Sequence, residues 1–123
     1  MTRLIVFAGL PGIGKSSIAR GLAKELDAVW LRIDSIEQAI RESALAPGSV
    51  EDAGYRAAYA VAEDNLRLGR DVIGDSVNDW MLTRNAWRDV GLRAGAKVVE
   101  VEILRRRPEI SAALQFRHKR PRI

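Results

Sequence analysis

The chain has no cysteine and one histidine, and none of its apolar runs approaches the roughly 18 residues that a membrane-spanning helix needs. The lack of thiols excludes disulfides and thiolate metal sites. The first residues hold one arginine and a short apolar run before a glycine-rich stretch, which is too short for a signal peptide. We therefore expect a cytoplasmic protein without a membrane partner, and the 123 residues fit a single domain, 1–123.

Acidic residues are almost missing from the end of the chain. Residues 105–123 hold seven Lys/Arg against one acid, whereas residues 1–104 hold thirteen Lys/Arg against fifteen acids. The basic character thus belongs to the tail, so we do not expect nucleic acid as the main partner. A basic tail helix that binds nucleic acid or an acidic surface is an alternative, and salt-sensitive binding that is lost on deletion of residues 105–123 would support it.

Apolar patterns predict strands that alternate with helices. Residues 4–8 form a continuous apolar run, which is typical of a strand buried on both faces. Further strands are predicted at residues 29–33, 71–74 and 97–104. Helical stripes are predicted after the glycine-rich stretch, at residues 36–40, 55–66 and 83–94, and in the tail. This order predicts a parallel sheet with helices on both faces, a three-layer αβα fold, with ligands at the carboxyl ends of the strands.

The glycine-rich stretch matches the phosphate-binding pattern GxxxxGK[ST], with Gly9, Gly14, Lys15 and Ser16 at its fixed positions. Glycines let successive backbone N–H groups turn inward as a nest for phosphate oxygens, and the following helix adds its N-terminal donors. Lys15 supplies a cation for the β and γ phosphates, and Ser16 a hydroxyl for Mg²⁺. The predicted nucleotide-binding residues are Gly9, Leu10, Pro11, Gly12, Ile13, Gly14, Lys15, Ser16 and Ser17.

Acidic residues follow the second and third predicted strands. Asp34 could accept a proton from a substrate hydroxyl, although it could equally be a helix N-cap with Glu37 completing a capping box. Asp75 could hold the Mg²⁺ hydration shell, or it could be a turn residue. Asn78, Asp79 and Trp80 follow in the same loop and could face a substrate. The remaining candidates are predicted to be structural, with Arg84 a surface arginine and Trp30 and Trp87 packing residues.

Four stretches together resemble a known family. They are "LIVFAGLPGIGKSSIARGLA", "AVWLRIDSIEQAI", "AGYRAAYAVAEDNLRLGRDVIGDSVND" and "TRNAWRDVGLRAGAKVVEVEI". They are similar to the bacterial small P-loop kinases described as AAA-domain predicted kinases, which are related to chloramphenicol phosphotransferase, zeta toxins and gluconate and shikimate kinases. The resemblance implies a P-loop NTPase fold with sheet order 2-3-1-4-5. It implies that Asp34 binds or deprotonates the acceptor hydroxyl and that Asp75 is the acid after the third strand.

The tail departs from this family pattern. The relatives carry a lid helix with arginines after the fourth strand, then a fifth strand and an adenine-contacting loop, whereas this chain continues as "LRRRPEISAALQFRHKRPRI". We therefore treat 104–123 as an atypical basic tail, in which Arg105, Arg106 and Arg107 could replace the lid arginines. The hypothesis is a truncated or frame-shifted coding sequence whose domain lacks the last strand, and sequencing the gene past this region tests it.

These observations predict an enzyme, a kinase that transfers the γ-phosphate of ATP to a hydroxyl of a small molecule. Lys15 and Asp34 are the predicted catalytic residues, Ser16 and Asp75 the predicted metal ligands, and ATP and Mg²⁺ the predicted cofactors. The alternative is a nucleotide-binding module with little or no phosphotransfer, because its C-terminus is incomplete. The acceptor and the oligomeric state stay open.

Overall fold

The computed structural model describes residues 1–9, 14–43, 52–76 and 81–102. Strands and helices alternate through these residues. In chain order they are β1 (Arg3–Ala8), α1 (Lys15–Leu26), β2 (Val29–Arg32), α2 (Ile33–Glu42), α3 (Ala53–Arg67), β3 (Val72–Asp75), α4 (Met81–Arg93) and β4 (Lys97–Glu102).

The four strands form one parallel sheet in the order β2-β3-β1-β4. This confirms the predicted α/β class and the first four positions of the sheet order that the resemblance implied. The predicted lack of a fifth strand concerns residues 103–123, which lie outside the described residues, as does the predicted tail helix. β1 has β3 on one side and β4 on the other, so the strand order reverses at β1: the chain crosses from one side of β1 to the other between β3 and β4. In open parallel sheets of this kind the ligand-binding crevice lies at the carboxyl ends of the strands.

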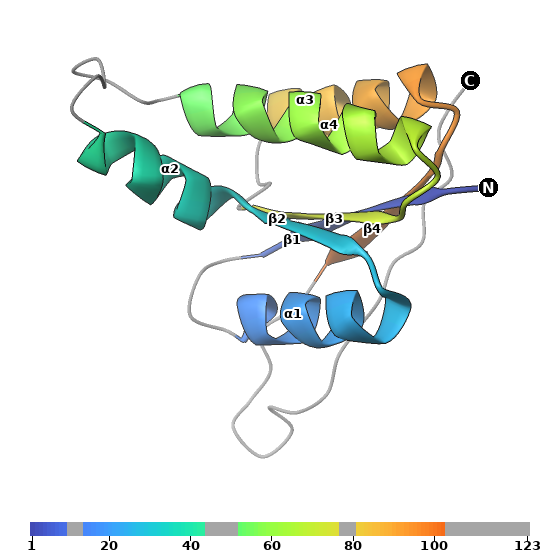
Figure 1. The fold of residues 1–123 in the computed structure, drawn as a ribbon, viewed down its shortest axis with the longest axis horizontal. Coiled ribbons are helices and arrows are strands. Elements are labelled where there is room, and N and C mark those ends of the chain that lie inside the picture. Colours follow the sequence, from blue (N-terminus) through green and yellow to red (C-terminus); the bar gives the residue numbers. More distant parts are fainter. Residues whose placement is uncertain (10–13, 44–51, 77–80, 103–123) are drawn as a thin grey trace.

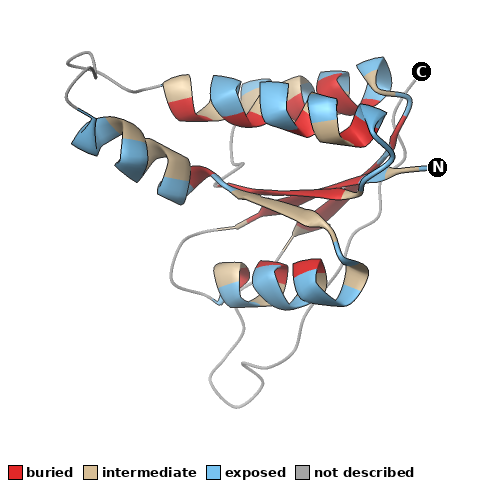
Figure 2. Ribbon diagram, viewed as in Figure 1, coloured by how far each residue is buried: buried red, intermediate tan, exposed pale blue. Residues whose placement is uncertain are grey.

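Helices cover both faces of the sheet (Figure 1). On one face lies α1, and on the other α3 and α4 pack side by side with α2 against the end of α3. Each face has its own apolar core. Between the two cores, β1, β3 and β4 are mostly buried and drawn red in Figure 2, whereas β2 is half-buried. The core on the α1 face includes Ile5, Phe7 and Ile73, and the opposite core includes Leu4 and Trp87. The predicted burial of residues 4–8 on both faces is confirmed.

Close approach of α4 to the sheet depends on glycines. The ring of Trp87 lies against Gly74 of β3, where an added Cβ would come within 2.8 Å of the indole carbons. A side chain at Gly91 would likewise collide with Val98 of β4. The "GD" step at the end of the third strand therefore has a packing reason: only glycine leaves room for a fully buried tryptophan.

The predicted ends of two strands differ from the structure. Ile33 begins α2 instead of ending β2, because its side chain is buried in the core beneath α3. β3 ends at Asp75 instead of Gly74, because Asp75 still pairs with Phe7 of β1 and Arg32 of β2. The fourth strand is described as far as Glu102, so its predicted end at residue 104 lies outside the described residues, and its residues from Val98 to Val101 are buried.

Candidate functional site

The predicted phosphate-binding stretch lies at the carboxyl end of β1, where it joins α1. Gly9 and Gly14 flank its undescribed residues and have φ angles of 144° and 82°, values that favour glycine over any L side chain. Gly14 is the N-cap of α1, and the first turn after it contains no acidic residue and no side-chain cap among the described residues. The N-terminal N–H groups of α1 and its dipole thus face this edge of the sheet without a carboxylate to neutralise them. Leu10, Pro11, Gly12 and Ile13 lie outside the described residues.

Lys15 and Asp75 meet at the centre of this edge. The Lys15 ammonium donates to Asp75 Oδ1 over 2.9 Å and to the backbone carbonyl of Ser76 over 3.1 Å. Both side chains are nearly closed to solvent, with 6% of Lys15 and 1% of Asp75 exposed. Burying a charge is costly unless it is paired and hydrogen-bonded, so this ion pair exists because each partner neutralises the other. The structure therefore joins two residues that the sequence placed 60 positions apart.

Two tryptophans donate hydrogen bonds near this pair, but only Trp30 contacts the pair itself. Trp30 of β2 donates its indole N–H to Asp75 Oδ2 over 3.0 Å, so each carboxylate oxygen of Asp75 has its own donor. Trp87 of α4 donates to the hydroxyl of Ser76 over 3.4 Å. Packing was the prediction for both residues, and it holds for Trp87, which is fully buried. For Trp30 it was incomplete, because no local pattern shows that a residue of β2 reaches the end of β3.

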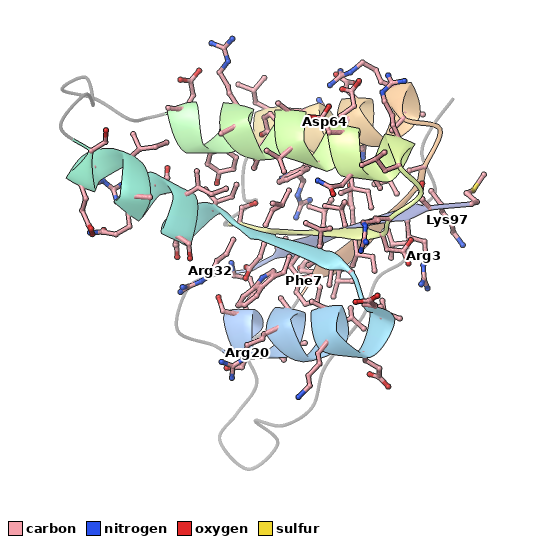
Figure 3. All side chains as sticks on the ribbon, viewed as in Figure 1. Arg3, Phe7, Arg20, Arg32, Asp64 and Lys97 are labelled. Carbon is pink, nitrogen blue, oxygen red and sulfur yellow. The ribbon has the colours of Figure 1, made fainter. Side chains whose placement is uncertain are left out.

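Ser16 contacts a further residue that the sequence did not single out. Arg32, the last residue of β2, donates from Nε to Ser16 Oγ over 3.3 Å and from its terminal nitrogen to Ser35 Oγ over 3.4 Å. Figure 3 shows Arg32 at this end of the sheet, on the side of α1. The period-2 alternation of β2 places Trp30 and Arg32 on the same face, but it does not show which residues of other elements they contact.

Asp34 lies on the same edge but outside this cluster. It is exposed in the first turn of α2, and no hydrogen bond or ion pair joins it to another residue of the described ranges. The N-cap of α2 is Arg32, with no side-chain cap, so the alternative of Asp34 as the N-cap of a capping box is wrong. The reason is that β2 ends one residue earlier than expected, which moves Asp34 into the helix. An acid in the first turn still interacts favourably with the helix dipole.

Two arginines of α4 form ion pairs with β4 on the opposite face of the sheet. Arg88 donates to Glu100 over 2.8 Å, and Arg84 lies 3.9 Å from Glu102. Arg84 has a quarter of its side chain exposed, so it is partly buried where the sequence predicted a solvated surface arginine. The two pairs follow one another toward the carboxyl end of β4 because residues four apart on a helix and two apart on a strand share a face.

Tyr59 of α3 supports Trp87 from the other side. The two rings meet edge to face with centroids 4.8 Å apart. Burial, and after it the neighbouring Tyr55, raises the pKa of the Tyr59 phenol to about 12. The phenol is therefore neutral at ordinary pH, and its role is to pack and not to act as a base.

The donor set at this edge fits a magnesium–nucleotide complex. Mg²⁺ prefers oxygen ligands and is usually held by one or two protein groups together with substrate phosphates. Ser16 offers a hydroxyl and Asp75 a carboxylate, next to a lysine and a helix N-terminus suited to the phosphates. Among the described residues no group of three or more His, Cys, Asp or Glu side chains could hold a metal.

The remaining features of the described residues lie elsewhere. An open depression of about 790 Å³ is located at the opposite edge, before β1 and β3, and it is lined by residues that include Thr2, Leu26, Arg70 and Asp71. None of the residues of the Lys15–Asp75 cluster lines it. No described helix has the length and apolar character of a membrane span. Asn78, Asp79 and Trp80 lie outside the described residues.

This parallel sheet, with a lysine at the start of the first helix and an acid at the end of the neighbouring strand, defines a P-loop domain of the kinase type. A protein-family model described as "AAA domain" matches residues 4–122, and the chain belongs to this family. The match includes most of the basic tail. The resemblance that the sequence showed is thereby confirmed, and nucleotide binding is the property that this class shares.

Relatives of known sequence are longer than this chain. Rv2004c, an uncharacterized protein of Mycobacterium tuberculosis, is 30% identical over 100 residues, which cover 77% of this chain and 20% of that protein. The chain thus spans about a fifth of the length of the curated relatives it matches.

Solved kinases share the fold. The M. tuberculosis APS kinase CysC in complex with AMPPNP and APS has a TM-score of 0.67 at 26% identity, covering 82% of this chain and 61% of that one. A sugar kinase from Janibacter sp. HTCC2649 has a TM-score of 0.63 at 22% identity, covering 91% of this chain and 65% of that one.

Proposed function

We propose that the chain binds Mg·ATP at the carboxyl edge of its sheet and transfers the γ-phosphoryl group to a hydroxyl of a small molecule. The observation that carries this proposal is the buried Lys15 ammonium, which lies at the start of α1 and between Asp75 and the Ser76 carbonyl. A lysine in that place can reach phosphates bound at the helix N-terminus, where it acts as a compact cation. The likeness to a kinase solved with AMPPNP and APS supports nucleotide binding by this fold.

The nucleotide-binding residues in this proposal are Gly9 to Ser17, in which the backbone N–H groups from Gly12 to Ser17 and the Lys15 ammonium hold the phosphates. Ser16 and Asp75 would hold Mg²⁺, which neutralises charge on the β and γ phosphates when bound. To bind Mg²⁺, the Ser16 hydroxyl would give up its hydrogen bond from Arg32. Arg32 would then lie beside the phosphates as a second cation. Positioning and charge neutralisation are the main sources of rate in this class of reaction.

Asp34 is the proposed base. The acceptor oxygen forms a bond to the γ-phosphorus, the bond between that phosphorus and the β–γ bridging oxygen breaks, and ADP leaves. The proton of the acceptor hydroxyl passes to the Asp34 carboxylate. Exposure of Asp34 at the start of α2 suits this role, because the carboxylate is free of described protein partners and open to a substrate.

Calorimetric titration with Mg·ATP tests the binding step. Lys15→Ala should abolish binding, because it removes the cation that faces the phosphates. Lys24→Ala is the matched control, since Lys24 is an exposed lysine of the same helix, in its last turn. Circular dichroism establishes that each variant is folded. A folded wild type that does not bind Mg·ATP, or a Lys15→Ala variant that binds as well as Lys24→Ala, would overturn the proposal.

Transfer is tested with γ-labelled ATP and a panel of sugars, hydroxylated antibiotics and nucleosides. Asp34→Asn should bind Mg·ATP as the wild type does and lower transfer by about 10²- to 10⁴-fold, the usual contribution of a general base. Nucleotide binding without transfer to any acceptor would instead support the alternative of a nucleotide-binding module. Equal transfer by Asp34→Asn would remove Asp34 from the mechanism.

A further inference from the structure

The Asp75 carboxylate has two oxygens, and within the described part of the chain each has one donor, from a different element. Oδ1 accepts from Lys15 of α1, and Oδ2 accepts from the indole of Trp30 of β2. The carboxylate is 1% exposed, so solvent does not replace either donor. These two hydrogen bonds fix the orientation of the carboxylate in the nucleotide-free chain.

Only one of the two donors stays in place when a nucleotide binds. Under the proposed function the Lys15 ammonium turns to the phosphates, and Oδ1 becomes available to the hydration shell of Mg²⁺. Trp30 belongs to a strand that is paired with β3, and its backbone is in register with Ile73, two residues before Asp75. Its indole is therefore held by the sheet and continues to hold Oδ2. A carboxylate with neither donor would be free to turn about its χ2 torsion.

We infer that Trp30 is the positioning residue for Asp75, so that its indole N–H keeps Oδ1 directed at the metal once Lys15 has moved to the phosphates. This inference rests on the proposed function and adds a residue that the phosphate-binding pattern does not contain. Partners that orient a metal-binding carboxylate typically contribute about 10- to 100-fold to metal affinity. The role of Trp30 should therefore appear in the coupling between Mg²⁺ and nucleotide, and not in nucleotide affinity alone.

The test measures the dissociation constant of AMPPNP by calorimetry, once with Mg²⁺ and once in EDTA. The ratio of the two constants is the affinity that Mg²⁺ adds. Trp30→Phe keeps an aromatic ring and removes the donor, and it should lower this ratio by about tenfold. The affinity in EDTA should stay close to that of the wild type. Trp30→Leu repeats the loss of the donor if the phenylalanine variant does not fold.

Two control variants separate the donor from packing. Trp87→Phe removes an indole N–H that donates to the Ser76 hydroxyl and not to Asp75, on the opposite side of the sheet, and it should leave the ratio unchanged. Trp30→His loses the six-membered ring but keeps a ring nitrogen at the position of Nε1. At pH 8, where imidazole is neutral, it should restore most of the ratio.

Each outcome decides a separate point. The positioning role would be overturned, while the proposed function stands, by either of two results. One is a ratio that Trp30→Phe leaves unchanged, and the other is a ratio that Trp30→Phe, Trp30→His and Trp87→Phe lower equally. No AMPPNP binding by the folded wild type would overturn the proposed function and this inference with it. A loss in Trp30→Phe that Trp30→His restores and Trp87→Phe does not share would establish the positioning role.

Discussion

Lys15 and Asp75 are buried together, so each charge is stable in the fold only while the other is present. Lys15→Met keeps the aliphatic stem and leaves the carboxylate with Trp30 as its donor. We expect it to lower the free energy of unfolding of the nucleotide-free chain by about 3–5 kcal/mol, the usual cost of an unpaired buried charge. The measurement is urea unfolding followed by circular dichroism.

The double variant Lys15→Met/Asp75→Asn is the control for this prediction. It has no buried charge, and its carboxamide oxygen can still accept from Trp30, so we expect it to recover most of the loss. If the double variant were as unstable as Lys15→Met, the loss would come from packing of the lysine stem and the charge argument would be contradicted.

At the residue scale, the sequence predicted which side chains matter better than it predicted their contacts. Lys15 and Ser16 follow from a fixed spacing, because the pattern itself encodes the turn into a helix. Trp30 and Arg32 could not be assigned in this way. Their partners are distant in sequence or lie on another element, and the contact exists only because β2 pairs with β3.

At the element scale, glycines that look alike in the sequence have opposite effects. Gly91 of α4 lies against Val98 of β4, and an added Cβ would collide with it. Gly21 of α1 is exposed, with no atom within 4 Å of an added Cβ. We expect Gly91→Ala to lower the free energy of unfolding by about 1–3 kcal/mol through overpacking. Gly21→Ala should raise it by about 0.5–1 kcal/mol through helix propensity.

Both variants replace a glycine inside a helix with alanine, so each is the control for the other. Thermal and urea unfolding measure the two changes. A stabilised Gly91→Ala variant would mean that α4 can move away from β4 without cost, and the close approach would then not be a requirement of the fold.

A comparison of the predicted and observed ends of helices and strands shows which elements could be predicted from the sequence. α3 and α4 have long apolar stripes and are followed by Gly69 and Gly95 with φ of 89° and 69°, so both helices and their ends were predicted within two residues. The ends of the short strands β2 and β3 were each misplaced by one residue. A parallel strand buried on both faces continues for as long as its neighbour offers a partner, as Phe7 does for Asp75. This partner is absent from the local sequence.

At the scale of the whole molecule, the carboxyl and amino ends of the strands form two edges of the sheet, which hold different kinds of contact. The carboxyl edge holds the Lys15 cluster, and the amino edge holds ion pairs that join elements. Figure 3 shows Arg3 and Lys97 at the amino edge, at the opposite end of the sheet from Arg32. Glu63 of α3 accepts from Arg67 and from Arg93 of α4, and these hydrogen bonds lower the pKa of its carboxyl. Such pairs make the stability of the fold depend on pH without touching the site.

Asp71, which precedes β3, joins β1 and β2 at the amino edge. Its carboxylate accepts from the backbone N–H and the guanidinium of Arg3 in β1, both over 2.7 Å, and its carbonyl accepts from Val29 of β2. Burial raises the pKa of the Asp71 carboxyl, but the hydrogen bonds from Arg3 outweigh it and hold the pKa below its ordinary value of 3.8. The folded chain therefore binds this proton less readily than the unfolded chain. The stability that Asp71 adds is complete above pH 3.8 and is lost as the pH falls through the folded-state pKa.

Asp71→Asn should consequently destabilise the chain at neutral pH and not in acid. Arg3 is 44% exposed, so we expect a loss of only about 1 kcal/mol at pH 7, in the range of partly exposed ion pairs. Urea unfolding of both proteins from pH 7 to pH 2 gives the difference at each pH, and it should shrink below pH 3.8. The affinity for Mg·ATP at pH 7 should not change, because Asp71 lies at the opposite edge from Lys15. A difference that stays constant across the pH series would contradict the assignment, because it would mean that the carboxamide fails to pack and that the charge of Asp71 contributes nothing.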